Sequence, residues 1–92
     1  MYLVVHHSVI DREKFQATDP RDIAGNAPAG CRVRHFLPAT DTSAADCLWD
    51  AESLDLLRSY LDPATRGVCE NTYFEVDSEL AMGLPEPAPI RP

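Results

Sequence analysis

The sequence predicts an α+β domain: a four-stranded antiparallel sheet with helices on one face. Four segments have the β-branched and aromatic content, or the alternation of side chains, that is typical of strands. The stretches after the first and third of these segments carry helix caps followed by apolar residues at helical spacing. The 92 residues have the length of one domain, and a hydrophobic content of 45% is normal for a globular protein.

The segment 43–53 organises this prediction. It has the pattern of a strand that leads directly into the cap of a helix, and turn signals bound it on both sides. We therefore expect it in the middle of the sheet. The other strands are expected over residues 1–9, 31–37 and 69–76.

The region between the first two strands is predicted to be helical but interrupted. Asp11 is placed to cap a short helix that runs through Phe15. Asp19 and Pro20 repeat this signal, with Asp as the cap and Pro in the first turn. Residues 25–26, Gly-Asn, then end the helical segment.

Another helix follows the strand within 43–53. Either Asp50 or Ser53 caps it, and Asp62 followed by Pro63 is expected to stop it. Its apolar stripe consists of Leu54, Leu57 and Leu61. The order of elements is then strand, helix, strand, strand, helix, strand, which is the split βαβ arrangement of ferredoxin-like βαββαβ domains.

Right-handed crossovers place both helices on one face of the sheet, with the strands in the order fourth, first, third, second. The opposite face stays open. Because a domain this small buries only about 60–65% of its unfolded surface, we expect a homodimer that covers the open faces. We assign residues 1–83 to the domain and residues 84–92, with four prolines, to an extended or disordered tail.

Charge and composition restrict the function. The net charge of −7 argues against nucleic acid as a partner, because that role needs a basic patch, and it disfavours anionic membrane surfaces. No apolar run approaches the roughly 20 residues of a membrane span, and no signal peptide is recognisable. The three cysteines, Cys31, Cys47 and Cys69, are widely spaced and odd in number. They predict reduced thiols in a cytoplasmic protein.

Three motifs are similar to those of one protein family. They are His6-His7-Ser8 in the first strand, CLWDAES over residues 47–53, and ENTYFEV over residues 70–76. Together they resemble a family of small bacterial ferredoxin-like proteins with a nickel-binding branch. Members of that family resemble dimeric α/β-barrel proteins. The resemblance implies a ferredoxin-like fold, a dimeric α/β barrel and, as cofactor, a nickel or other transition-metal ion, without assigning ligand residues.

Alternation along the strands assigns side chains to the two faces of the sheet. In the third strand, placing Trp49 and Cys47 against the helices puts Asp46 and Asp50 on the open face. The same preference for burying the apolar set, applied to the fourth strand, puts Phe74 on the helix side. The predicted open face then carries Arg32, Arg34, Asp46, Asp50, Asn71, Tyr73 and Glu75.

The adjacent histidines of the first strand must point into opposite layers. We assign His7 to the open face, near Tyr73 or Glu75, and His6 to the helix side. The two histidines are also the candidate metal ligands, since imidazole suits nickel, copper and zinc. Opposite orientations prevent them from binding one ion without distortion, and no C-x-x-C or H-x-x-x-H spacing is present.

Three classes of function follow. The leading hypothesis is a dimeric binding protein that holds a small metabolite or metal ion in a polar cavity on the open face. Its ligand-binding residues would be His7, Arg34, Asp46, Asp50, Tyr73 and Glu75. A competing hypothesis is a cofactor-independent enzyme of the isomerase, cyclase or monooxygenase type, with a His–carboxylate acid/base pair. The third is a structural or regulatory partner module whose polar residues form a dimer interface.

Overall fold

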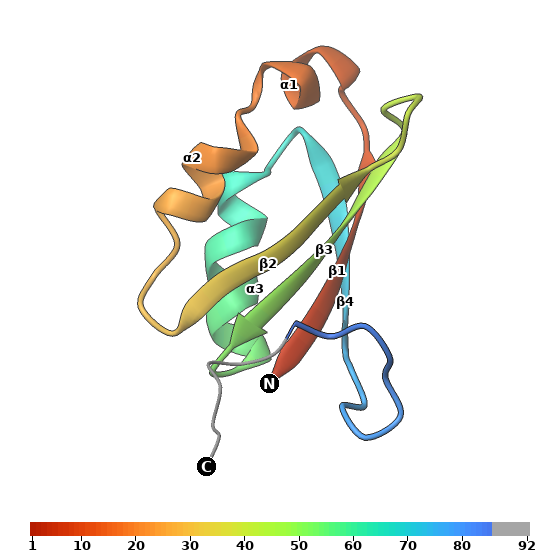
Figure 1. Ribbon diagram of the computed structural model, residues 1–92. Helices are drawn as coiled ribbons and strands as arrows, with labels where there is room; N and C mark the ends of the chain where they lie inside the picture. The colour runs from red at the N-terminus through yellow and green to blue at the C-terminus, as the bar shows by residue number, and fades with distance from the viewer. Residues whose placement is uncertain (86–92) are drawn as a thin grey trace.

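Four strands form one antiparallel sheet in the order β2-β3-β1-β4 (Figure 1). The computed structural model describes residues 1–85. Read from the other edge, the order is fourth, first, third, second, as the sequence predicts, so β3 and β1 are central. The strands span Tyr2–Val9 (β1), Cys31–Pro38 (β2), Ala44–Ala51 (β3) and Cys69–Glu75 (β4).

Helices connect these strands on one side of the sheet (Figure 1). Helices α1 (Arg12–Ala17) and α2 (Pro20–Gly25) lie between β1 and β2, and α3 (Leu54–Ala64) lies between β3 and β4. The order of elements therefore departs from a simple βαββαβ succession, because two six-residue helices replace the first single helix.

Two separate caps cause this division. The Asp11 carboxylate accepts a hydrogen bond from the Lys14 N–H at 3.0 Å, and the Asp19 carboxylate accepts one from the Arg21 N–H at 2.9 Å. Each aspartate therefore starts its own helix, and Pro20 in the first turn fixes the second start. The predicted interruption of this region is confirmed.

Helix α3 begins at a cap formed by Ser53, whose hydroxyl accepts a hydrogen bond from the Leu56 N–H at 3.1 Å. The helix ends one residue beyond the predicted stop at Pro63, because it continues through Ala64 and Pro63 lies in its last turn. Proline removes only its own N–H bond, and the Thr65 N–H still donates to the Leu61 carbonyl at 3.0 Å.

The core lies between the helices and the sheet. Its largest fully buried side chains are Leu3, Val5, Trp49, Leu57 and Leu61. Cys47 belongs to the same buried cluster, so the prediction that Trp49 and Cys47 face the helices is confirmed. Full burial of these apolar side chains is the main source of stability, at about 1.5–3 kcal/mol for each aliphatic side chain.

The predicted faces of β4 are reversed. Tyr73 pairs with Val5, and Phe74 pairs with Val4 on the adjacent strand. Because directly paired residues share a face, Tyr73 joins Val5 on the helix side, together with Asn71 and Glu75. Phe74 is 59% exposed on the open face. Tyr73, Asn71 and Glu75 carry a hydroxyl, an amide and a carboxylate. In a sequence, such polar side chains are typical of positions that face solvent.

The histidines are reversed in the same way. His7 continues the alternation of Leu3 and Val5 and is only 5% exposed, whereas His6 lies on the open face beside Asp46. The prediction that the two histidines occupy opposite layers is confirmed, and the choice of His7 for the open face is wrong. Apolar residues alternate equally well on both faces of β1, so the sequence offered no signal for the choice.

A β-bulge changes the register of β2. Val33 pairs with Trp49, but the next pairs are His35 with Leu48 and Phe36 with Cys47. The extra residue places Phe36 on the helix side with Cys47, whereas simple alternation would place it on the same face as Arg34. Simple alternation cannot reveal such a shift.

The chain after β4 returns toward the start of β1, where the Tyr2 hydroxyl donates to the Pro85 carbonyl at 2.8 Å. The predicted tail over 84–92 lies mostly outside the described residues. Within residues 1–85, no helix is long and apolar enough to cross a membrane.

Candidate functional site

A cavity of about 270 Å³ lies between the sheet and the helices. Most of its wall is apolar and includes Phe15, Ile23, Val33, Trp49 and Val68. One end is polar, where His7 of β1, Cys47 of β3 and Cys69 of β4 meet. No Asp, Glu, Lys or Arg lines the cavity within the described part of the chain.

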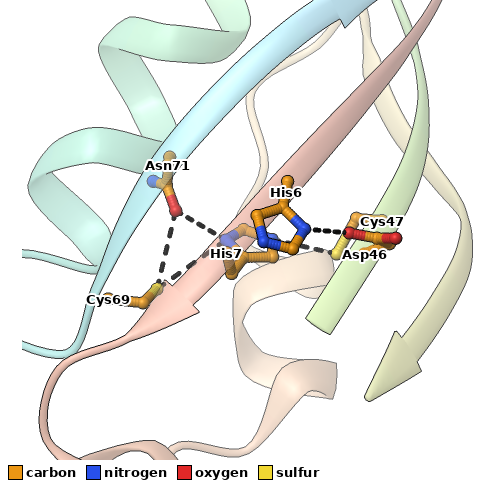
Figure 2. Close-up of polar contacts among 6 residues, drawn as sticks. All are labelled: His6, His7, Asp46, Cys47, Cys69 and Asn71. Carbon is orange, nitrogen blue, oxygen red and sulfur yellow. Dashed lines mark hydrogen bonds and ion pairs between the residues drawn. The ribbon is translucent and has the colours of Figure 1, made fainter. Parts of the chain in front are cut away.

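His7 connects the two cysteines that line this polar end. Its Nε2 lies 3.1 Å from the Cys47 Sγ, and its Nδ1 lies 2.6 Å from the Asn71 Oδ1. The Cys69 Sγ lies 3.7 Å from the same Nδ1 and 3.5 Å from the Asn71 Oδ1. Figure 2 shows the imidazole between Cys47 on one side and Asn71 and Cys69 on the other.

The surroundings of Asn71 determine which imidazole nitrogen carries the proton. The Asn71 Nδ2 donates to the Thr65 Oγ1 at 2.9 Å and to the Asp62 Oδ1 at 3.1 Å. The Thr65 hydroxyl donates a hydrogen bond to the Leu61 carbonyl at 2.8 Å, so the hydroxyl oxygen can accept one from Asn71. The amide oxygen of Asn71 therefore faces His7 and must accept from it. This assigns the proton to Nδ1 and leaves Nε2 to accept from the Cys47 thiol.

Burial keeps both partners neutral. Desolvation lowers the pKa of His7 below its ordinary 6.5, and the hydrogen bond that His7 donates to Asn71 opposes this shift only in part. Desolvation also raises the pKa of Cys47 to about 12, and the nearby Trp49 indole opposes the rise. At neutral pH the pair is therefore a thiol that donates to a neutral imidazole.

Trp49 contributes a polar atom with no partner. Its side chain is 2% exposed and lines the cavity. The indole N–H lies near the Cys47 sulfur but does not reach hydrogen-bond geometry with any atom of residues 1–85. The indole nitrogen itself is inaccessible, so this donor is enclosed by protein atoms beside the Cys47 sulfur and does not open into the cavity.

The polar network continues from Asn71 toward the surface. The Tyr73 hydroxyl donates to the Asp62 Oδ1 at 2.6 Å, and the Arg58 guanidinium lies over the Tyr73 ring at 5.3 Å from its centroid. Burial and the neighbouring Asp62 carboxylate raise the pKa of Tyr73. Tyr73 and Asp62 thereby hold the amide of Asn71 in place.

The remaining predicted ligand residues do not join this cavity. On the open face, His6 donates to the Asp46 carboxylate at 2.6 Å, and Arg34 lies 3.6 Å from the Asp50 carboxylate. Glu75 is exposed at the end of β4, on the helix side. The predicted set is therefore divided: His7, Tyr73 and Glu75 on the helix side, and Arg34, Asp46 and Asp50 on the open face.

A shared metal ion does not fit these residues. His6 and His7 point to opposite faces of the sheet, and Cys47 and Cys69 approach opposite edges of the His7 ring. Within residues 1–85, no three His, Cys, Asp or Glu side chains are grouped closely enough to hold an ion. The nickel suggested by the family resemblance has no matching ligand set here.

The sequence prediction missed the main members of the site: Cys47, Asn71 and the indole of Trp49. The assignment of Cys47 to the helix side was correct but indicated only a buried thiol. Assigning His7 to the same side would have suggested the pair, since the two residues lie on neighbouring strands. The contribution of Asn71 depended on the reversed face of β4.

Comparisons with protein-family models, with curated proteins and with solved structures found no match. The family resemblance of the three motifs therefore stays a prediction, and the functional conclusions below depend on the geometry alone.

Proposed function

We propose that this protein binds a small, uncharged and largely apolar organic molecule that carries one hydrogen-bond acceptor. The observation that supports this most directly is the mostly apolar cavity of about 270 Å³, whose described lining carries no acidic side chain, lysine or arginine. This proposal keeps the predicted binding role and moves the binding site from the open face to the helix side of the sheet.

The size of the cavity limits the ligand. A volume of about 270 Å³, at about 30 Å³ for each water-sized unit of liquid, has room for roughly nine non-hydrogen atoms. This is slightly below the range of about 300–1,000 Å³ that is common for drug-sized ligands. A ketone, ester or aldehyde with a short alkyl chain has the required size.

The lining explains why the ligand is uncharged. Transfer of an ionised group into an apolar cavity is costly unless a counter-charge meets it. The described lining offers no such charge, because His7 is neutral and the other polar groups are thiols, hydroxyls and one amide. A carbonyl oxygen carries no net charge and can instead accept from the Gln16 amide in the lining.

Trp49 is the only tryptophan of the chain, so its indole N–H gives one unambiguous NMR signal. Titration with 2-heptanone should move this signal to saturation, because the ketone packs against the indole ring that lines the cavity. Hexanoate, a charged molecule of similar length, should leave the signal nearly in place, because the described lining offers no counter-charge.

Paired variants make this test specific for the cavity. Ala24 lines the cavity and Ala17 does not, although both are helical alanines in the first crossover. Ala24→Phe should abolish the response to 2-heptanone, whereas Ala17→Phe should preserve it. An unchanged indole signal in the wild-type protein at saturating 2-heptanone would refute the proposed binding site.

The open face supports the second part of the proposal, a ferredoxin-like homodimer of the dimeric α/β-barrel type. Phe74 is 59% exposed and Leu37 is 64% exposed, and register places both on this face. A second copy of the chain would bury these side chains and pair with the exposed charges around them. Light scattering at micromolar concentration should give a dimer, and Phe74→Glu should give a monomer. A wild-type monomer would contradict the dimer without affecting the cavity.

A further inference from the structure

We propose that the cavity is the site of an acyl-transfer reaction, with Cys47 as nucleophile and His7 as general base toward a small uncharged ester or thioester. This inference rests on the proposed binding function and names the ligand as a reactant. It combines three features at the polar end of the cavity: a thiol, a base, and a residue that orients the base.

The thiol and the base have the geometry of an activated nucleophile. The distance of 3.1 Å between the Cys47 Sγ and the His7 Nε2 is within direct hydrogen-bond reach. On its far side, the imidazole is held by Asn71 at 2.6 Å. A Cys-His-Asn constellation of this kind recurs on unrelated folds, where it is identified by the roles of the residues and not by their order in the chain.

The tautomer of His7 is the one that this chemistry requires. Asn71 keeps the proton on Nδ1, since its own amide N–H groups are directed to Thr65 and Asp62. Nε2 therefore presents its lone pair to the Cys47 thiol. Asn71 does not touch the substrate, and we describe it as a positioning residue.

The reaction has two balanced steps. In the first, the Cys47 sulfur forms a bond to the acyl carbon while its proton moves to the His7 Nε2. The bond from this carbon to the leaving alkoxide or thiolate breaks, and the leaving group takes the proton from Nε2. In the second step, water gives a proton to Nε2 and attacks the thioester. The carbon–sulfur bond breaks, the thiolate recovers the proton, and a carboxylic acid leaves.

The neutral resting state is consistent with this assignment of roles. Cys47 is a thiol and His7 an unprotonated base at neutral pH, so proton transfer accompanies attack and no preformed ion pair is needed. The groups next to this pair on the helix side are Cys69, Asn71 and Trp49, and the charged groups His6 and Asp46 act on it only electrostatically, from the open face. The nearest of these that touch it directly are uncharged, which keeps the imidazole available as a base.

The test uses p-nitrophenyl hexanoate, because its hexanoyl group is within the size that the cavity volume allows. The wild-type protein should release one equivalent of p-nitrophenolate in a rapid first turnover. Intact mass should increase by one hexanoyl group, and peptide mapping should place this group on Cys47. Mapping of the wild-type protein needs no variant, so the result does not depend on how substitutions affect folding.

Matched variants assign the roles. Cys47→Ser should lose the acylation, while Cys31→Ser, at a buried thiol that does not line this cavity, should retain it. His7→Gln should lower the acylation rate constant at saturating ester by about 10²–10⁴-fold. Asn71→Ala should lower the same rate constant while leaving the affinity for 2-heptanone unchanged, a division that a purely structural role would not produce. Thermal unfolding of each variant shows whether it is folded.

The possible failures are distinguishable. If 2-heptanone moves the indole signal of Trp49 but the ester does not acylate Cys47, the acyl-transfer inference is wrong and the binding function stands. Acylation that maps to Cys31 or Cys69 in place of Cys47 also overturns the inference. If neither probe interacts, the proposed binding function fails as well.

Discussion

The two faces of the sheet place the same residue type in opposite environments. His6 and His7 are neighbours in β1, yet His6 lies on the open face in an exposed ion pair and His7 lies in a buried, uncharged network. On the open face, water screens the exposed charges of His6 and Asp46. It also hydrates each of these groups nearly as well as the partner does. On the helix side, each polar group depends on one specific neighbour. Chemistry is therefore expected on the helix side, where proton positions are fixed.

The largest contrast is expected from the aromatic residues. Trp49→Ala should lower the free energy of unfolding by about 3–5 kcal/mol, because it opens a cavity in the core beneath the helices. Phe74→Ala, on the open face, should change the stability of the monomer by only about 0.5 kcal/mol. Urea unfolding of both variants gives the comparison. Similar values for the two would mean that the assignment of faces is reversed in solution.

The next contrast concerns the two histidine networks. Asn71→Ala removes the acceptor of the buried His7 N–H, and an unsatisfied buried donor costs about 1–3 kcal/mol. The matched change on the open face, Asp46→Ala, leaves His6 to water and should cost less than about 1 kcal/mol. Chemical denaturation measures both. Equal costs would indicate that water reaches His7.

Acidification should affect the helix side first. In the unfolded chain His7 takes up a proton near its ordinary pKa of 6.5, whereas burial lowers this pKa in the folded protein. As pH falls below 6.5, the unfolded state binds the proton before the folded state does, so stability decreases until the folded pKa is reached. Above pH 6.5 the imidazole is neutral in both states and contributes no pH dependence. His7→Gln should therefore flatten the loss of stability below pH 6.5.

The same stability measurement at alkaline pH tests the Cys47 thiol. The Cys47 thiol ionises near 9.0 in the unfolded chain but only at about 12 in the folded protein, so stability should decline above pH 9. If the His7→Gln variant loses stability below pH 6.5 as the wild type does, a group other than His7 causes that loss.

The strongest local patterns of the sequence predicted the fold correctly. Asp11, Asp19 and Ser53 cap helices as expected, and the alternation around Trp49 gave the correct faces of β3. These successes share a cause: capping and a strand with one clearly apolar face are decided by nearby residues. The order of the strands followed from the handedness of the connections.

The candidate site was not predictable to the same extent. It depends on β4, where Asn71 and Tyr73 face inward because they satisfy His7 and Asp62, and not because they are apolar. Polar residues that satisfy one another inside a protein look like surface residues in a sequence. The bulge between Val33 and His35 likewise has no signal in the pattern of apolar residues.

The smallest effect, and the one that examines the open face itself, is the coupling between His6 and Asp46. Their side chains are 47% and 54% exposed, so a double-mutant cycle with His6→Gln and Asp46→Asn should give at most about 1 kcal/mol at low salt. The coupling should nearly vanish in about 1 M NaCl, where the Debye length is about 3 Å. A coupling above about 2 kcal/mol that resists salt would require the pair to be desolvated. Since no part of the described chain covers this face, a second copy of the protein would then have to cover it. Phe74→Glu should prevent this dimer contact. If the dimer causes the strong coupling, repeating the cycle in the Phe74→Glu background should return the coupling to at most about 1 kcal/mol.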